Sequence, residues 1–312
     1  MLGELVAPRF LLLYVFVGSA AYVHLRGRVR HRLQRQLTDH STVFAPLNVL
    51  IYAASAVPRT PLLDPRAFPE LAVLREHWRE MRAEAAALLV QGEVRPSESH
   101  QDVAFNTFFA RGWRRFHLKW YDDFLPSAQA RCPQTVALLR AVPTVRAALF
   151  ALLPAGGKLT AHRDPYAGSL RYHLGLITPN SDVCRIFVDG EPYAWRDGED
   201  VVFDETYIHR AENRTDQDRV ILFCDVERPL RTPVMRALNR LIAGYVLRVT
   251  ASQNVPTEQV GLVNRVAGGV HGIRQVLRRA KRANRRLYYA AEYTLWAVIL
   301  YALFLRVLLR GR

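Results

Sequence analysis

The sequence predicts a mainly β core, an antiparallel sandwich or barrel, with helices flanking it and an apolar segment at each end of the chain. Two observations predict the core. Between about residue 105 and residue 228, short runs rich in β-branched and aromatic residues alternate with turn signals. These runs follow one another without helical stretches, and the chain has no GxGxxG or Walker loop. The pattern therefore favours antiparallel strands and argues against a Rossmann sheet.

Length and charge narrow the class of protein. The 312 residues, 50% hydrophobic and 23% charged, suffice for a full globular core. Three widely separated cysteines, Cys132, Cys184 and Cys224, exclude a disulfide scaffold and favour a reducing compartment. The net charge of +15 comes from the two ends, because residues 36–273 hold 27 basic and 26 acidic residues. Basic charge beside apolar ends indicates membrane flanks, so we expect no nucleic-acid partner.

The N-terminal segment is predicted to be a membrane anchor over residues 1–25. Phe10 to Leu25 is a 16-residue apolar run, slightly shorter than the roughly 20 residues of a typical span. Ser19-Ala20-Ala21 would also suit a cleaved signal peptide. The five arginines that follow the run between residues 26 and 35 oppose export, so we expect an uncleaved anchor and a cytoplasmic domain after it.

The C-terminal end has the same pattern. Seven arginines and lysines between residues 274 and 286 precede an apolar stretch, for which we predict a second membrane segment over 287–309. An amphipathic helix on the membrane surface is the alternative. Before it, 231–286 is expected to be a helical basic region.

The middle of the chain divides in two. We expect a basic, Pro-rich linker over 26–68 and the main domain over 69–230. Within that domain a helix is predicted at 69–89 and the barrel at about 105–230. The predicted strands include 115–121, 169–177, 184–188, 201–204 and 219–226.

A set of polar residues in the predicted strands is suited to iron. His162 and Asp164 stand two residues apart, so extended backbone directs both side chains to one side, and His209 follows another strand. Two imidazoles and a carboxylate form the facial triad that leaves positions open on a ferrous ion. Arg219, at the start of a later strand, can pair with the far carboxylate of a 2-oxo acid.

The strand SLRYHLGLI adds two candidates. Its alternation places Ser169, Arg171 and His173 on one face, and such a face inside a small barrel is costly unless it binds something. Each residue alone has a structural explanation, such as a hydrogen-bonded core histidine or a surface ion pair. A zinc hydrolase is less well supported, because the chain lacks HExxH.

Several segments resemble the aspartyl/asparaginyl β-hydroxylase family of Fe(II)/2-oxoglutarate dioxygenases, and most of all its bacterial lipid A 2-hydroxylases. They are HRDPYAGSLRYHLGL (162–176), CRIFVDGEPYAWRDGE (184–199), FDETYIHRAEN (203–213), RVILFCDVERP (219–229), WRRFHLKWY (113–121) and APLN (45–48). The resemblance implies a double-stranded β-helix, that is, a jelly-roll or cupin-like barrel.

It also implies the site and its cofactors. His162, Asp164 and His209 would be the catalytic metal ligands for Fe(II). Arg219 would bind the distal carboxylate of the co-substrate 2-oxoglutarate, Arg171 and His173 would assist, and O2 would be consumed. The protein-modifying branch places a serine where this chain has Ala151, which puts closeness to that branch in doubt.

The implied function is hydroxylation of C2 of a secondary acyl chain of lipid A at the bacterial inner membrane, with the catalytic domain facing the cytoplasm. Three alternatives stay open: a peptidyl Asp/Asn β-hydroxylase, a hydroxylase of another membrane lipid such as an ornithine-type aminolipid, and a non-enzymatic membrane-anchored barrel that binds ligands. The sequence makes no prediction of oligomeric state.

Overall fold

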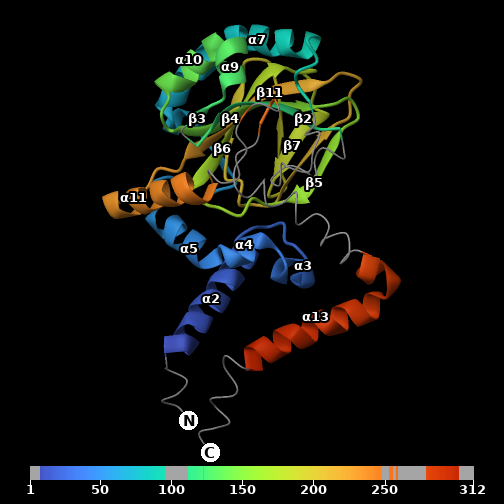
Figure 1. The fold of residues 1–312 in the computed structure, drawn as a ribbon. Helices are drawn as coiled ribbons and strands as arrows, with labels where there is room; N and C mark the ends of the chain where they lie inside the picture. Colours follow the sequence, from blue (N-terminus) through green and yellow to red (C-terminus); the bar gives the residue numbers. More distant parts are fainter. Residues whose placement is uncertain are drawn as a thin grey trace, which may run out of the picture.

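Two antiparallel sheets form the core of the computed structural model, which describes residues 8–95, 112–121, 123–247, 253–255, 258 and 279–301. The larger sheet has the strand order β1-β9-β6-β11-β4-β2-β3, and the smaller has the order β5-β10-β7-β8 (Figure 1). The strands are β1 (Leu62–Leu63), β2 (Arg114–Trp120), β3 (Asp123–Phe124), β4 (Val145–Leu153), β5 (Lys158–His162), β6 (Ser169–Ile177), β7 (Cys184–Val188), β8 (Glu191–Ala194), β9 (Asp200–Phe203), β10 (His209–Asn213) and β11 (Arg219–Glu227).

The strand order is that of a jelly roll. From β4 to β11 the chain crosses between the sheets, so that β4, β6, β9 and β11 lie in one and β5, β7, β8 and β10 in the other. The predicted antiparallel barrel is therefore confirmed. The predicted strands at 169–177 and 184–188 agree with β6 and β7 residue for residue.

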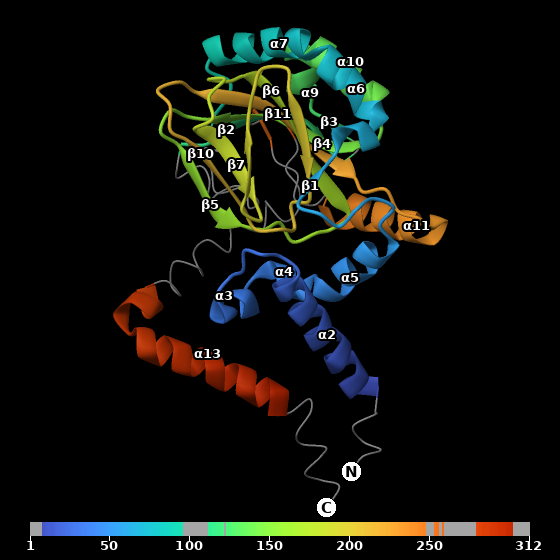
Figure 2. The ribbon, with the colours of Figure 1, turned by 180° about the vertical axis from the view of Figure 1, so that it is seen from behind.

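Helices cover the outer face of the larger sheet (Figure 2). Leu170, Tyr172 and Leu174 of β6 join the core under these helices, while Arg171 and His173 point into the barrel, as the alternation predicts. The helices are η1 (Pro65–Ala67), η2 (Pro69–Leu71), α6 (Ala72–Glu76), α7 (Trp78–Val90), α9 (Pro126–Arg131) and α10 (Pro133–Ala141).

The expectation that no helix interrupts the strands is wrong at one place. Residues 126–141 form α9 and α10 between β3 and β4, and Pro126 and Pro133 each open one of them. Proline suits the first helical turn because its fixed φ is helical and its missing N–H is not needed there.

A second group of helices lies at the opposite end of the barrel (Figures 1 and 2). The segment expected to be a linker, 26–68, contains three of them, packed on the barrel through Ile51, Tyr52 and Tyr166. This group comprises α2 (Pro8–Leu25), α3 (Leu33–Leu37), α4 (His40–Val43), α5 (Ala45–Ala54), α11 (Pro233–Ile242), the π-helical turn η3 (Ala243–Leu247) and α13 (Arg285–Leu300).

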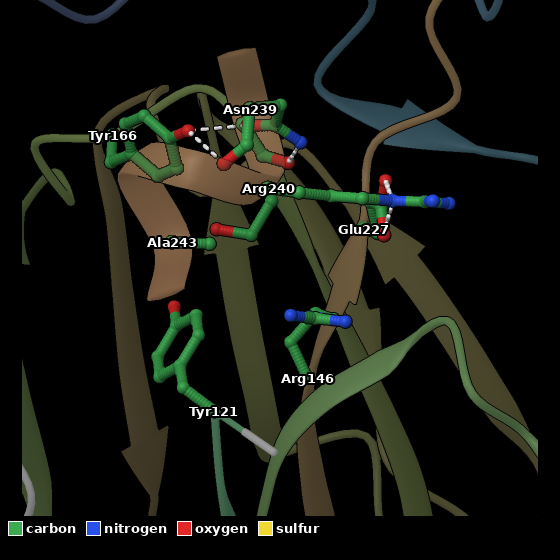
Figure 3. Close-up of a pocket in the computed structure, with 9 residues that line it drawn as sticks. Tyr121, Arg146, Tyr166, Glu227, Asn239, Arg240 and Ala243 are labelled. Atoms are coloured by element: carbon green, nitrogen blue, oxygen red, sulfur yellow. Dashed lines mark hydrogen bonds and ion pairs between the residues drawn. The ribbon is translucent and has the colours of Figure 1, made fainter. Parts of the chain in front are cut away.

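Helix α11 is fixed to the barrel by polar contacts. The Tyr166 hydroxyl hydrogen-bonds to Asn239, and Arg240 pairs with Glu227 at 3.0 Å (Figure 3). The cavity enclosed there has a volume of about 10 Å³, room for about one water molecule. Helix α11 lies at the start of the region 231–286 for which we predict a helical basic segment, and residues 248–252, 256–257 and 259–278 lie outside the described part.

In the described part of the chain, no helix is both long and apolar enough to cross a membrane. The spans predicted within 1–25 and 287–309 are therefore not supported by α2 or α13. Helix α2 has 18 residues and buries Phe10 and Val23 against the protein, and α13 has 16 residues and contains Glu292. Residues 1–7 and 302–309 lie outside the described ranges.

Candidate active site

Three predicted metal ligands come together where β5 meets β10. His162, the last residue of β5, pairs directly with His209, the first residue of β10, and Asp164 follows two residues after His162. One ligand atom of each residue lies within 4.8 Å of those of the other two. Strand pairing thus brings together two histidines that are 47 positions apart in the sequence.

Both imidazoles are oriented by backbone carbonyls. His162 Nδ1 lies 2.7 Å from the Thr160 carbonyl, and His209 Nδ1 lies 3.0 Å from the Tyr207 carbonyl. Donation from Nδ1 leaves the Nε2 lone pairs for a metal, as in most histidine metal sites. Burial, with the nearby His162, lowers the pKa of His209 to about 3, so this ligand is neutral at pH 7.

Asp164 is held in place by an arginine. Arg171 Nη2 donates to the Asp164 carboxylate at 2.6 Å, and the same guanidinium pairs with Glu205 and with Asp225, the latter at 3.3 Å. Ser169 donates to Glu205 at 2.7 Å, and Tyr121 donates to Asp225 at 3.1 Å. We call these six residues the Arg171 network.

The charges in the network keep the metal ligand ionised. Burial raises the pKa of Glu205 well above its usual range, and the carboxylates of Asp225 and Asp164 add to this effect. Burial would also raise the pKa of Asp164, but the charges of Arg171, His209 and His162 hold it below its usual range. Asp164 therefore stays ionised and available to a cation.

From the metal centre a row of rings leads across the barrel. Phe203 lies against both His209 and His173, with ring centroids 5.6 and 5.0 Å away. His173 is followed by Trp195 at 5.9 Å, and the Arg219 guanidinium lies 4.2 Å above the Trp195 ring. Around this row, aliphatic and aromatic side chains from both sheets form an apolar wall.

The far end of this row contains polar groups without partners. Arg219 is 2% exposed, its Nε has no hydrogen-bond partner, and none of the ion pairs among the described residues includes it. Both ring nitrogens of His173 and the indole N–H of Trp195 are likewise buried and unpartnered. Burial lowers the pKa of Arg219 to about 10, so it is still a cation at pH 7. A buried cation that lacks a carboxylate is costly unless a bound anion compensates it.

The residues of the site fit both Fe(II) and 2-oxoglutarate, the two groups that the sequence predicts. Two Nε2 atoms and an ionised carboxylate are a donor set for Fe(II), and the unpartnered Arg219 is a receptor for a carboxylate inside the same barrel.

Comparisons with known proteins concern the same part of the chain. The family described as aspartyl/asparaginyl beta-hydroxylase matches residues 75–229, which include every residue of the metal centre and the ring row. Residues 75–229 thus form a domain of this family. An ornithine lipid ester-linked acyl 2-hydroxylase from Rhizobium tropici is 35% identical over 55% of this chain and 62% of its own length. Human aspartate beta-hydroxylase domain-containing protein 2 is 32% identical over 38% of this chain and 34% of its own.

The chain thus spans less than two thirds of the length of these curated relatives. Among solved structures, a Pseudomonas putida prolyl-4-hydroxylase is similar over 49% of this chain and 87% of its own, at 20% identity and a TM-score of 0.34.

The structure distinguishes among the predicted site residues. His162, Asp164 and His209 meet as expected, and His173 and Arg219 lie in one interior. Arg171, predicted to assist the co-substrate, is bound to three carboxylates, so its contact with a co-substrate stays a prediction. Sequence reasoning missed Glu205, Asp225 and Trp195. A signal for Glu205 is present in the sequence, because it stands beside Asp204 in the loop before His209. Charged side chains in such a loop are seldom buried without a partner.

Proposed function

We propose that this protein is an Fe(II)- and 2-oxoglutarate-dependent dioxygenase that hydroxylates C2 of an acyl chain of a membrane lipid. One observation supports this chemistry: the same apolar barrel contains the triad of His162, Asp164 and His209 and a buried Arg219 without a carboxylate partner.

Each residue has a defined task in this proposal. The Nε2 atoms of His162 and His209 and the carboxylate of Asp164 would hold iron, which with 2-oxoglutarate and O2 supplies the oxidising power for C–H hydroxylation. Arg219 would bind the distal carboxylate of 2-oxoglutarate, and the neutral His173 would offer it a hydrogen bond. Arg171 would fix the carboxylate of Asp164, and the apolar wall would exclude water.

The substrate class rests on the relative from Rhizobium, whose name gives an ester-linked acyl chain of ornithine lipid. That name supports an aminolipid at least as well as lipid A, so we propose both as substrates to be tested. The proposal places the protein at the inner membrane of a bacterium, with the barrel on the cytoplasmic side.

The test is lipid mass spectrometry in a Gram-negative host that makes ornithine lipid and lipid A and hydroxylates neither. We expect the wild-type chain to yield one lipid class heavier by one oxygen, with fragmentation placing the hydroxyl at C2. His209→Ala should abolish the product, because it removes a metal ligand. His77→Ala is the matched control, because that histidine stands at the start of α7, outside the barrel, and among the described residues its side chain pairs with Glu80 at 3.0 Å.

The outcome also separates the alternatives. If both lipid classes stay unmodified while purified protein converts 2-oxoglutarate to succinate, the lipid proposal fails. Peptides are then the substrates to test. If His209→Ala and His77→Ala are equally active, the metal centre is wrongly assigned.

A further inference from the structure

The large apolar side chains that stay exposed are gathered at one end of the molecule. Among the residues that the structure describes, all of them except Val90 and Val183 lie before residue 51 or after residue 233. Nearly all of them belong to the helices at the metal end of the barrel, whereas α7 and α10 cover the outer face of the larger sheet on the opposite side of the molecule (Figures 1 and 2). Helix α2 alone exposes Leu12 by 72% and Val15 by 57%. A concentration of this kind marks an interaction surface.

The same end carries uncompensated positive charge. Arg30, Arg32 and Arg35 follow α2 and are exposed, and the ion pairs found among the described residues include none of them. A groove of about 390 Å³ between α5 and the barrel is lined by Arg59 and Arg231, with Tyr52 and Ser55, and contains no carboxylate in its lining. We call this surface, formed by α2 to α5, α11 and these arginines, the basic apolar face.

We propose that the basic apolar face docks the protein onto an anionic lipid bilayer, with the metal centre directed toward the membrane. Exposed apolar side chains beside unpaired arginines match the acyl boundary and the headgroup phosphates of such a bilayer. A second copy of the chain fits less well, because it would bring two sets of unpaired arginines together.

The face is joined rigidly to the metal centre. Arg35 donates to the Ala161 carbonyl at 2.9 Å, and Arg163 donates to the Val23 carbonyl at 2.8 Å, so the residues on both sides of His162 are tied to the end of α2 and the segment after it. Docking of α2 would therefore fix the position of His162 relative to the bilayer.

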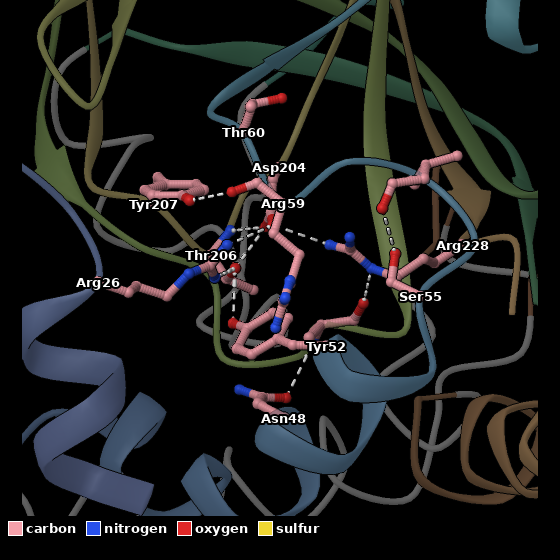
Figure 4. A network of polar contacts seen from close by, with 12 residues as sticks. Arg26, Asn48, Tyr52, Ser55, Arg59, Thr60, Asp204, Thr206, Tyr207 and Arg228 are labelled. Atoms are coloured by element: carbon pink, nitrogen blue, oxygen red, sulfur yellow. Dashed lines mark hydrogen bonds and ion pairs between the residues drawn. The ribbon is translucent and has the colours of Figure 1, made fainter.

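A second connection runs through the loop that carries His209. Arg26 is sandwiched between the rings of Tyr52 and Tyr207 at 4.0 and 3.9 Å, and pairs with the fully buried Asp204 at 2.8 Å (Figure 4). Arg228 pairs with the same carboxylate at 2.9 Å. Because Asp204 lies in the loop between β9 and β10, the face and the metal ligands form one unit.

This inference extends the proposed function, because it names the surface through which a lipid substrate would be reached. Vesicle binding is measured without turnover, so either can fail without the other.

The experiment measures which end of the protein enters lipid. Cys132, Cys184 and Cys224 are all buried, so a cysteine introduced on the surface can be labelled selectively with an environment-sensitive fluorophore. Leu12→Cys and Leu50→Cys place the label on the face, and Val90→Cys, at a site that is 90% exposed on α7, is the matched control. With vesicles of phosphatidylglycerol and phosphatidylcholine, we expect a blue shift and quenching by brominated lipid at 12 and 50, and neither at 90.

A charge variant tests the second part. Arg30→Gln with Arg32→Gln should weaken binding to the phosphatidylglycerol vesicles about tenfold, and binding to pure phosphatidylcholine should change little. These arginines are exposed, so circular dichroism should show an unchanged fold. The proposal is overturned if the label at 90 responds as strongly as those at 12 and 50. It is also overturned if the face labels respond to protein concentration instead of lipid, since the face would then join two copies.

Discussion

The two ends of the barrel interior each contain a buried arginine, and the two arginines differ in their partners. At the metal end, Arg171 is surrounded by three carboxylates, and each of these has a further hydrogen bond or lies beside a metal ligand. At the other end, the Arg219 guanidinium lies over the Trp195 ring, and no carboxylate of a described residue pairs with it. The charge of Arg171 is thus compensated by its neighbours, whereas that of Arg219 is not. The presence of carboxylate partners, not burial or residue type, therefore distinguishes Arg171 from Arg219.

The largest effect that follows from this contrast is on stability. Arg171→Met would leave Asp164, Glu205 and Asp225 buried without their cation. Removing one partner of a buried ion pair typically costs about 3–5 kcal/mol, and we expect a loss of that size in the free energy of unfolding, measured by urea denaturation. Arg66→Met removes an exposed pair with Asp64 and is the control, for which no measurable loss is expected. Equal stability of the two variants would show that the network does not hold the fold.

Arg219→Met should have the opposite profile. It removes an uncompensated buried cation, so the free energy of unfolding of the free protein should stay constant or rise. The affinity of the metal-loaded protein for 2-oxoglutarate, measured by calorimetry, should fall roughly a hundredfold, because a buried carboxylate loses its charged partner. A variant that unfolds as easily as Arg171→Met, with unchanged affinity, would make Arg219 structural and remove the contrast.

The same contrast explains which residues the sequence could predict. Alternation along 169–177 identifies the inward face of β6, and the two-residue spacing of His162 and Asp164 identifies a candidate pair of metal ligands, since both signals are local. His209 joins them through the pairing of β10 with β5. Two of the three carboxylates that pair with Arg171, those of Glu205 and Asp225, are distant in the sequence. Asp225 reaches it because β11 pairs with β6 in a register that sets Asp225 opposite Arg171. No motif in the sequence states that register.

Long-range contacts also explain why the segment expected to be a linker is tied to the barrel. The sequence predicts an anchor followed by a linker, because apolar and basic runs there resemble membrane flanks. The structure places Arg26 against Asp204, 178 residues away, and thereby ties the segment after α2 to the barrel. A buried pair of this kind cannot be read from composition, because either residue alone is expected at the surface.

The smallest expected effect concerns His173, which stands between the two ends. Burial, together with the charges of Arg171, Arg219 and His209, lowers its pKa well below 6.5. Below about pH 6.5 the unfolded chain therefore binds a proton at His173, whereas the folded protein leaves His173 neutral. The free energy of unfolding falls as the pH drops through this range. His173→Phe keeps a ring among Trp195, Phe203 and Phe223 but removes the titrating group.

The measurement is the free energy of unfolding of metal-free protein at pH 7 and pH 5.5. Each protein serves as its own reference, so packing differences cancel. The wild type should lose about 1 kcal/mol more than His173→Phe over this interval, since an unfolded-state pKa near 6.5 is crossed in one and absent in the other. Equal losses would mean that His173 accepts its proton inside the barrel, which requires a nearby anion. The proposed binding of 2-oxoglutarate to an uncompensated Arg219 would then lose its support.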